Sequence, residues 1–230
     1  MANDNENPLL LDIKKPEFSA KRPLVVWQKL FLLFVFAALA AGMWKMPWYT
    51  TRVLIAVSTF FYLIFTVYKL MLVRLSVSRS SEIVVSKEEL NSIREEDIPL
   101  YSILVPLYKE PESIKQVIES INALDYPPHL KEVQILLEED DMETRKAAGT
   151  IRLPEGFSIT IVPKSFPRTK PKACNIGLAK AHGKYLVIYD AEDKPEHDQL
   201  KKAIVAFKKV SPSVICLQSK LNFYNQQQNL

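Results

Sequence analysis

Two long apolar stretches near the N-terminus limit most strongly what this chain can fold into. The first extends almost without a break from Leu24 to Met43, and the second from Val53 to Val73. Each is close to the roughly 20 residues that an α-helix needs to cross the hydrocarbon core of a bilayer. Because the segment between them is too short for a folded domain, the sequence predicts a polar tail over residues 1–22 and a transmembrane helical hairpin over residues 23–74.

The first stretch could also be a secretory signal peptide, and the pair could be buried core helices of a soluble protein. A signal peptide is disfavoured because no small-residue cleavage site follows the first stretch and a second apolar stretch comes at once. Core helices are disfavoured because both stretches reach the length of a membrane span. The hairpin is therefore the favoured interpretation.

The basic residues around the hairpin predict its orientation. More of them flank its outer ends, at Lys14, Lys15, Lys21, Arg22, Arg74 and Arg79, than its turn, which offers Lys45 and Arg52. Flanks rich in Lys and Arg stay on the cytoplasmic side of a membrane. We therefore expect a multi-pass protein of the inner (plasma) membrane, in contact with the lipid bilayer, with both ends and the following domain in the cytoplasm.

After a connector over residues 75–99, which contains a helical capping box from Ser86 to Glu89, apolar stretches of strand length alternate with helical patterns. Strands are predicted at residues 101–107, 133–137, 157–162, 185–189 and 214–217. Helices are predicted from Pro111, from Pro171 and around Leu200. This alternation is typical of an α/β fold with a mostly parallel, Rossmann-like sheet, and the nearly continuous apolar strands indicate that both faces are covered.

Carboxylates follow two of the predicted strands. Residues 138–141 follow one strand, and Asp190, Glu192 and Asp193 follow another. Parallel strands present their carboxyl ends at one edge of the sheet, where ligands bind, and clustered carboxylates suit Mg²⁺ or Mn²⁺. A basic loop over residues 163–172 would add positive charge for a diphosphate. The alternative is a solvated acidic turn before the next helix, where carboxylates are also favoured.

Composition excludes several classes of function. The formal net charge is only +4, and no basic stripe is interleaved with aromatic residues, so we expect no nucleic-acid partner. The chain has only five glycines and no glycine-rich phosphate loop, which argues against a P-loop ATPase and a dinucleotide-binding domain. The remaining alternative is a protein that binds a nucleotide through a metal ion.

Four segments, in their order along the chain, resemble those of family 2 glycosyltransferases. They are residues 105–110, the acidic segment 138–141, residues 172–177 and residues 190–193. The resemblance covers about residues 100 to 225, and cellulose synthase-like members also carry flanking membrane helices. It implies a GT-A fold and an inverting, Mg²⁺- or Mn²⁺-dependent transfer of a sugar from a nucleotide diphosphate donor, usually a UDP-sugar, to a glycan or polysaccharide acceptor.

The resemblance also implies site residues. The nucleoside would be held by Pro106, Leu107, Tyr108 and Glu110, with Glu139 or Asp140 accepting the uracil N–H. The positions near the diphosphate are Lys172 and Asn175. Asp190 would lie at the ribose or metal, and Glu192 or Asp193 would be a metal ligand. The sugar site would include Gln218, Lys220 and Asn222.

The chain departs from the family on the acceptor side. Family members use an Asp in a Thr-Glu-Asp-like stretch as the general base, and carry a Gln-x-x-Arg-Trp segment, both after the region of Asn222. We expect both beyond Leu230, so that residues 100–230 form the nucleotide-sugar-binding part of a transferase cut short. The alternative is a non-catalytic nucleotide-sugar-binding or partner-docking membrane protein. A membrane-attached nucleotidyltransferase is less favoured, because no glycine-rich loop follows the first strand.

Overall fold

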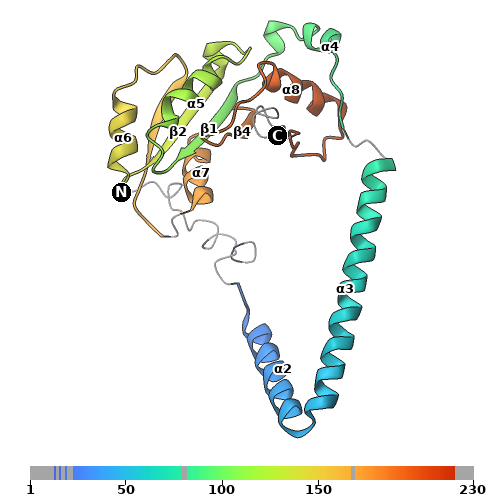
Figure 1. Cartoon of the computed structure of the whole chain (residues 1–230). Coiled ribbons are helices and arrows are strands. Elements are labelled where there is room, and N and C mark those ends of the chain that lie inside the picture. The colour runs from blue at the N-terminus through green and yellow to red at the C-terminus, as the bar shows by residue number, and fades with distance from the viewer. Residues whose placement is uncertain are drawn as a thin grey trace, which may run out of the picture. The chain divides into compact units, whose positions relative to one another are not determined.

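The structure is a computed structural model that describes residues 13, 16, 19, 23–78, 82–166 and 169–220 (Figure 1). The chain divides into two compact units. The described residues up to Glu82 belong to one unit, and those from Ile83 onward belong to the other. The first unit is purely helical in its described part, and the second holds the sheet.

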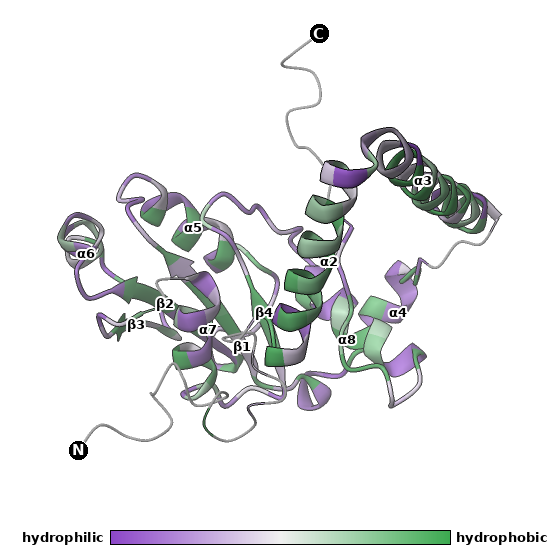
Figure 2. Ribbon diagram, turned by 90° about the horizontal axis from the view of Figure 1, so that it is seen from below, coloured by the Kyte–Doolittle hydropathy of each residue, from purple (hydrophilic) through white to green (hydrophobic). Residues whose placement is uncertain are grey.

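The helical unit consists of α2 (Val26–Lys45) and α3 (Pro47–Ser78), which contact each other and are joined at Met46. Neither helix buries a residue, and both are long and apolar enough to cross a membrane. Hydrophobic colours dominate α2 in Figure 2. At Gly42 a Cβ atom would come within 2.8 Å of the Thr50 hydroxyl, so glycine lets the two helices approach beside the turn.

The second unit is built on a four-stranded parallel sheet in the order β3-β2-β1-β4. Its strands are β1 (Tyr101–Leu107), β2 (Lys131–Glu138), β3 (Phe157–Val162) and β4 (Tyr185–Ile188). Ile103 pairs with Val133 of β2 on one side and with Val187 of β4 on the other. The prediction of a parallel α/β sheet is confirmed, including the bounds of β1 and β3.

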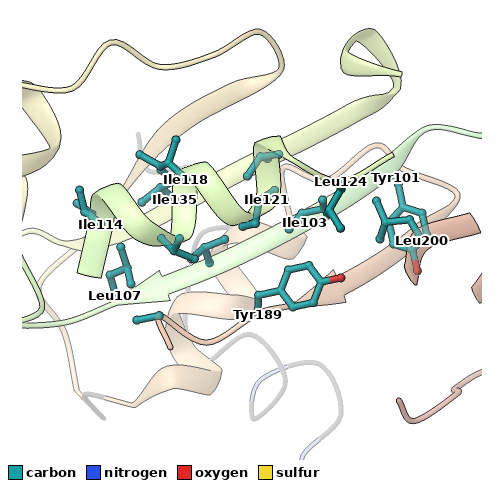
Figure 3. Packing of buried hydrophobic residues seen from close by; sticks show 14 of the residues in the cluster. Tyr101, Ile103, Leu107, Ile114, Ile118, Ile121, Leu124, Ile135, Tyr189 and Leu200 are labelled. Atoms are coloured by element: carbon teal, nitrogen blue, oxygen red, sulfur yellow. The ribbon is translucent and has the colours of Figure 1, made fainter. Parts of the chain in front are cut away.

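Helices cover both faces of this sheet. On one face α5 (Ser113–Asn122) buries Ile114, Val117, Ile118 and Ile121 over β1, and α8 (Gln199–Lys209) adds Leu200 and Ile204 to the same cluster (Figure 3). Full burial of each such side chain contributes about 1.5–3 kcal/mol. On the other face α7 (Lys170–Leu178) packs Ile176 near Leu104 and Leu136. The helix α6 (Met142–Gly149) follows β2 and contacts α5.

The predicted strand at residues 214–217 is wrong. The described residues there form no ladder with any other strand, and the Ile215 side chain is 91% exposed. A run of β-branched and apolar residues favours extended backbone, but a strand also requires a partner with free backbone groups alongside. Within the described part of the chain, β4 pairs only with β1.

The connector packs on the α/β unit. Its helix α4 (Lys87–Asn91) begins at the predicted capping box, in which Ser86 accepts from the Glu89 N–H and Glu89 accepts from the Ser86 N–H. Two short 3₁₀ turns, η3 (Glu95–Asp97) and η4 (Pro128–Leu130), precede β1 and β2. The Lys209 ammonium at the end of α8 donates to the Glu89 carboxylate and to the Val84 carbonyl, each at 2.7 Å. These bonds fix the connector to α8.

Candidate nucleotide-sugar site

A cavity of about 540 Å³ opens at the carboxyl ends of β1, β2 and β4. Six predicted site residues line it, namely Pro106, Leu107, Tyr108, Glu110, Asp190 and Glu192. The seven other lining residues had no individual role predicted, although Glu138 belongs to the predicted acidic segment and Thr169 and Lys170 to the predicted basic loop. They are Glu112, Ser113, Glu138, Thr169, Lys170, Ala173 and Ala191. The size lies in the usual range of small-molecule sites, about 300–1,000 Å³.

The other predicted site residues are not among those that line the cavity. They are Glu139, Asp140, Lys172, Asn175, Asp193, Gln218 and Lys220. Asn222 lies outside the described residues. For three of these residues, Asp193, Lys172 and Glu139, hydrogen bonds explain where the side chain is held.

The turn after β4 separates its acidic side chains. The Asp193 carboxylate accepts a hydrogen bond from the Asp190 N–H at 2.7 Å, and the Asp193 N–H donates to the Asp190 carbonyl at 3.1 Å. Asp193 therefore closes the turn, whereas Asp190 and Glu192 line the cavity. The Asp190 carboxylate contacts the ammonium of Lys170, the first residue of α7.

The loop after β1 adopts an unusual backbone conformation. Lys109 has φ of 57°, in the left-handed region that a non-glycine residue rarely adopts. The Asp141 carboxylate holds this conformation by accepting from the Lys109 N–H at 2.5 Å, and it also caps α6 by accepting from the Thr144 N–H at 3.1 Å. The Thr144 hydroxyl accepts from the Glu110 N–H at 3.2 Å. One carboxylate thus couples the β1 loop to α6.

The charge state of Asp141 reflects this role. Burial raises the pKa of its carboxyl, but the hydrogen bonds from Thr144 and from the Lys109 backbone outweigh burial, so that the net pKa is lowered. A depressed carboxyl pKa adds stability above the unfolded-state pKa, and that stability is lost as pH falls through the folded-state pKa. The bonds of Asp141 are therefore intact at neutral pH.

We expect Asp141→Ala to lower the free energy of unfolding by about 0.5–2 kcal/mol, because it removes a helix cap. It should also weaken nucleotide binding, because the β1 loop loses its anchor. Lys109→Gly is the matched variant: glycine tolerates the left-handed backbone, so this change should not destabilise the domain. Pulse proteolysis of both variants checks this, and an unchanged stability of Asp141→Ala would contradict the anchoring role.

Lys172 is buried and does not line the cavity. Its ammonium donates to the Glu138 carboxylate at 2.7 Å, and the two side chains are only 1% and 10% exposed. The same ammonium lies 3.3 Å from the Pro163 carbonyl and 3.5 Å from the Ser165 carbonyl. Glu139 also holds this loop, because its carboxylate accepts from the Lys164 N–H at 2.9 Å. Both predicted ligand residues are therefore engaged in fixing the loop that precedes α7.

The cavity carries an excess of negative charge. Burial raises the pKa of Glu110, and the nearby charges of Glu112 and Glu192 raise it further, whereas the charge of Lys170 lowers it. Carboxylates kept close together in this way are stabilised when a cation joins them.

The donor set fits a hard cation bound together with a phosphate. In the described residues no group of three or more His, Cys, Asp or Glu side chains is arranged as a metal site. Mg²⁺, however, is usually held by one or two carboxylates plus substrate phosphates, rather than by an all-protein cage. Asp190 and Glu192 supply two such carboxylates on the cavity wall.

The segment predicted to line a sugar site follows α8. The Gln199 amide donates to the Ser219 hydroxyl at 2.8 Å, and its carbonyl accepts from the Tyr189 hydroxyl at 2.8 Å. These bonds tie the segment to the end of β4. The neighbouring side chains of Gln218 and Lys220 are exposed.

Comparison with known proteins decides the family. A family model described as glycosyl transferase family 2 matches residues 102–229, which is more than half of the 230-residue chain. The chain belongs to glycosyl transferase family 2. The matched residues begin in β1 and include every residue that lines the cavity. The predicted membership is confirmed.

Individual relatives of this family 2 domain are distant. The probable glycosyltransferase YdaM of Bacillus subtilis (strain 168) is 24% identical over 102 residues, which make up 44% of this chain and 24% of the relative. The chain therefore spans about a quarter of that relative's length.

Among solved structures, the mannosyltransferase PcManGT from Pyrobaculum calidifontis, in complex with GDP-Man and Mn²⁺, has a TM-score of 0.50 and 24% identity. The match covers 70% of this chain and 44% of that chain. Residues 1–349 of TarS from S. aureus, in complex with UDP-GlcNAc, have a TM-score of 0.40 and 23% identity, covering 47% of this chain and 31% of theirs. The likeness to PcManGT confirms the predicted GT-A fold.

Proposed function

We propose that the cavity at the sheet edge binds the nucleotide diphosphate of a sugar donor, with UDP as the expected nucleotide, and that the domain serves the transfer of this sugar to a glycan acceptor. The observation that carries the proposal is the position of the cavity. It lies at the carboxyl ends of parallel strands, where α/β sheets bind ligands, and residues of all four segments that resemble the family contribute to its wall.

The residues have distinct proposed roles. Pro106, Leu107 and Tyr108 offer apolar and aromatic surface to the nucleoside at the end of β1. Asp190 and Glu192 would hold Mg²⁺ or Mn²⁺, which would bridge to the diphosphate. When bound, the cation would neutralise the charge that develops on the diphosphate as its bond to the sugar breaks. Lys172 and Glu139 would act indirectly, by fixing the loop over residues 163–165.

This proposal concerns the donor half of the reaction. Inverting transfer forms the new glycosidic bond on the face opposite the leaving diphosphate, and a base takes the proton of the acceptor hydroxyl. Asp190 and Glu192 are assigned to the cation and Glu138 is paired with Lys172, so none of these three carboxylates is proposed as that base.

Calorimetry on the detergent-solubilised chain tests donor binding. We expect UDP to bind in the presence of Mn²⁺ or Mg²⁺ and not after chelation, because the carboxylates and the diphosphate repel each other without a cation. UMP is the matched ligand, since it keeps the nucleoside and lacks the diphosphate, and it should bind more weakly and with less dependence on the metal. UDP binding that is unaffected by a chelator would contradict the metal-bridged site.

We further propose that α2 and α3 span a membrane as a hairpin and hold the α/β unit at the cytoplasmic face of the inner membrane. Lys29 and Lys69 support this arrangement. At 1.5 Å per residue they lie about 26 Å and about 35 Å along their helices from the turn at Met46. Both lysines are therefore far from the turn, where their ammonium groups can reach headgroups on one side of the bilayer.

Protease treatment of sealed inverted vesicles tests the topology. In these vesicles the cytoplasmic face is outside, so we expect the α/β unit to be digested and the hairpin to be protected. Right-side-out vesicles are the control and should protect the α/β unit. Protection of this unit in inverted vesicles would overturn the orientation.

A further inference from the structure

Lys170 lines the cavity, and the donor site proposed above gives it no role. It is the first residue of α7, and its ammonium contacts the Asp190 carboxylate. Both side chains are about half exposed, at 44% and 52%, so solutes can reach the pair. An exposed ion pair of this kind contributes little to stability and is easily exchanged.

Lys170 offsets part of the negative charge that the carboxylates around the cavity carry. The described lining includes five carboxylates, at Glu110, Glu112, Glu138, Asp190 and Glu192, and one basic side chain, Lys170. Glu138 is paired with the buried Lys172 ammonium. The Lys170 charge is also the one that opposes the effect of the neighbouring acids on Glu110. Lys170 is therefore the cation that partly neutralises this wall.

We propose, on the basis of the donor site proposed above, that the Lys170 ammonium and the divalent cation compete for the Asp190 carboxylate. The diphosphate removes this competition because the Lys170 ammonium then pairs with the diphosphate instead. A metal ion arriving alone must displace the ammonium into water. A metal ion arriving with a diphosphate frees the ammonium for phosphate oxygens, which bind ammonium groups well.

The position of Lys170 supports this exchange. It lies at the N-terminus of α7, a nine-residue helix whose dipole favours an anion there. Lys170 would thus couple the two ligands, because each makes the binding of the other more favourable.

Mn²⁺ titrations followed by electron paramagnetic resonance measure this competition directly. The detergent-solubilised full chain is titrated without nucleotide and with saturating UDP, and a protein-free titration corrects for Mn²⁺ bound to UDP in solution. We expect Lys170→Gln to bind Mn²⁺ alone about two- to fivefold more tightly, because an exposed ion pair no longer competes. We also expect it to bind UDP with Mn²⁺ more weakly by about the same factor.

Two control variants separate competition from a general charge effect. Lys164→Gln removes one positive charge from the same loop, and the exposed Lys164 side chain does not line the cavity. Lys170→Arg keeps the charge and should preserve the coupling. Equal effects of Lys164→Gln and Lys170→Gln, or an unchanged Mn²⁺ affinity in Lys170→Gln, would overturn the proposed competition.

Lysine labelling of the unaltered chain provides a second measurement that needs no variant. Acylation of Lys170, followed by mass spectrometry, should rise with Mn²⁺ alone and fall when UDP is added with Mn²⁺. A reactivity that does not respond to Mn²⁺ would overturn the competition. UDP binding that is independent of metal would instead refute the donor site itself, so the two failures are distinguishable.

Discussion

Replacing Asp190 by Asn and Glu192 by Gln together is expected to abolish most of the Mn²⁺-dependent affinity for UDP. Changes to groups that merely support a metal ligand cost about 10–100-fold, so the loss of two proposed ligands should exceed about 100-fold. The physical reason is that a divalent cation loses both of its neutralising partners, and the diphosphate loses its bridge to the sheet. Calorimetry at saturating Mn²⁺ measures the effect.

The matched control for this variant is Glu143→Gln with Glu155→Gln. Both glutamates are exposed and neither lines the cavity, so the charge changes equally while the site stays intact. Neither double variant should shift the free energy of unfolding by more than about 0.5 kcal/mol per site, because the changed side chains are exposed. UDP affinity that is retained in the Asp190 and Glu192 variant would refute these residues as metal ligands.

Breaking the buried ion pair of Lys172 and Glu138 should produce the largest loss of stability. We expect Lys172→Met to lower the free energy of unfolding by about 3–5 kcal/mol, because it leaves a buried carboxylate without a partner. The double change of Lys172→Met with Glu138→Met should recover most of this loss, since replacing both partners by apolar side chains leaves no buried charge.

The stability measurement must report on the α/β unit. All three tryptophans, Trp27, Trp44 and Trp48, lie in the helical hairpin, so tryptophan fluorescence would follow the wrong part of the chain. Pulse proteolysis in urea reports on the domain directly. Lys115→Met is the matched control, because Lys115 forms an exposed pair with Glu119 at 3.9 Å and should matter by less than about 1 kcal/mol. Equal effects of the two lysine variants would contradict a structural role of the buried pair.

The two central strands, β1 and β2, could be predicted because they are buried on both faces. Residues such as Ile103 and Leu104 point to opposite sides, yet each contacts a helix-covered layer, so the apolar pattern is continuous. The cavity residues at the ends of β1 and β4 were also predictable, since the strands themselves direct them to one edge. The prediction of a strand at residues 214–217 was wrong because the apolar pattern of this segment resembles that of a strand but does not show whether another strand lies alongside it.

The roles of two neighbouring lysines could not be read from the sequence. Lys170 and Lys172 are two positions apart on α7, so they point in directions about 200° apart around the helix axis. The basic loop was predicted to meet a diphosphate, but which lysine faces the cavity depends on where the helix begins. Lys172 also finds its partner Glu138 34 residues away, in β2, a contact that only the folded sheet creates.

The bare edge of β4 has a practical consequence for work on the α/β unit. Leu186 and Ile188 on this strand are 37% and 43% exposed, and no described residue pairs with the strand's second edge. An exposed edge with apolar side chains is a template on which another chain can add a strand, which leads to aggregation. Removing the apolar hairpin would therefore not by itself prevent aggregation of the α/β unit. A lysine introduced at position 188 would be the more direct remedy.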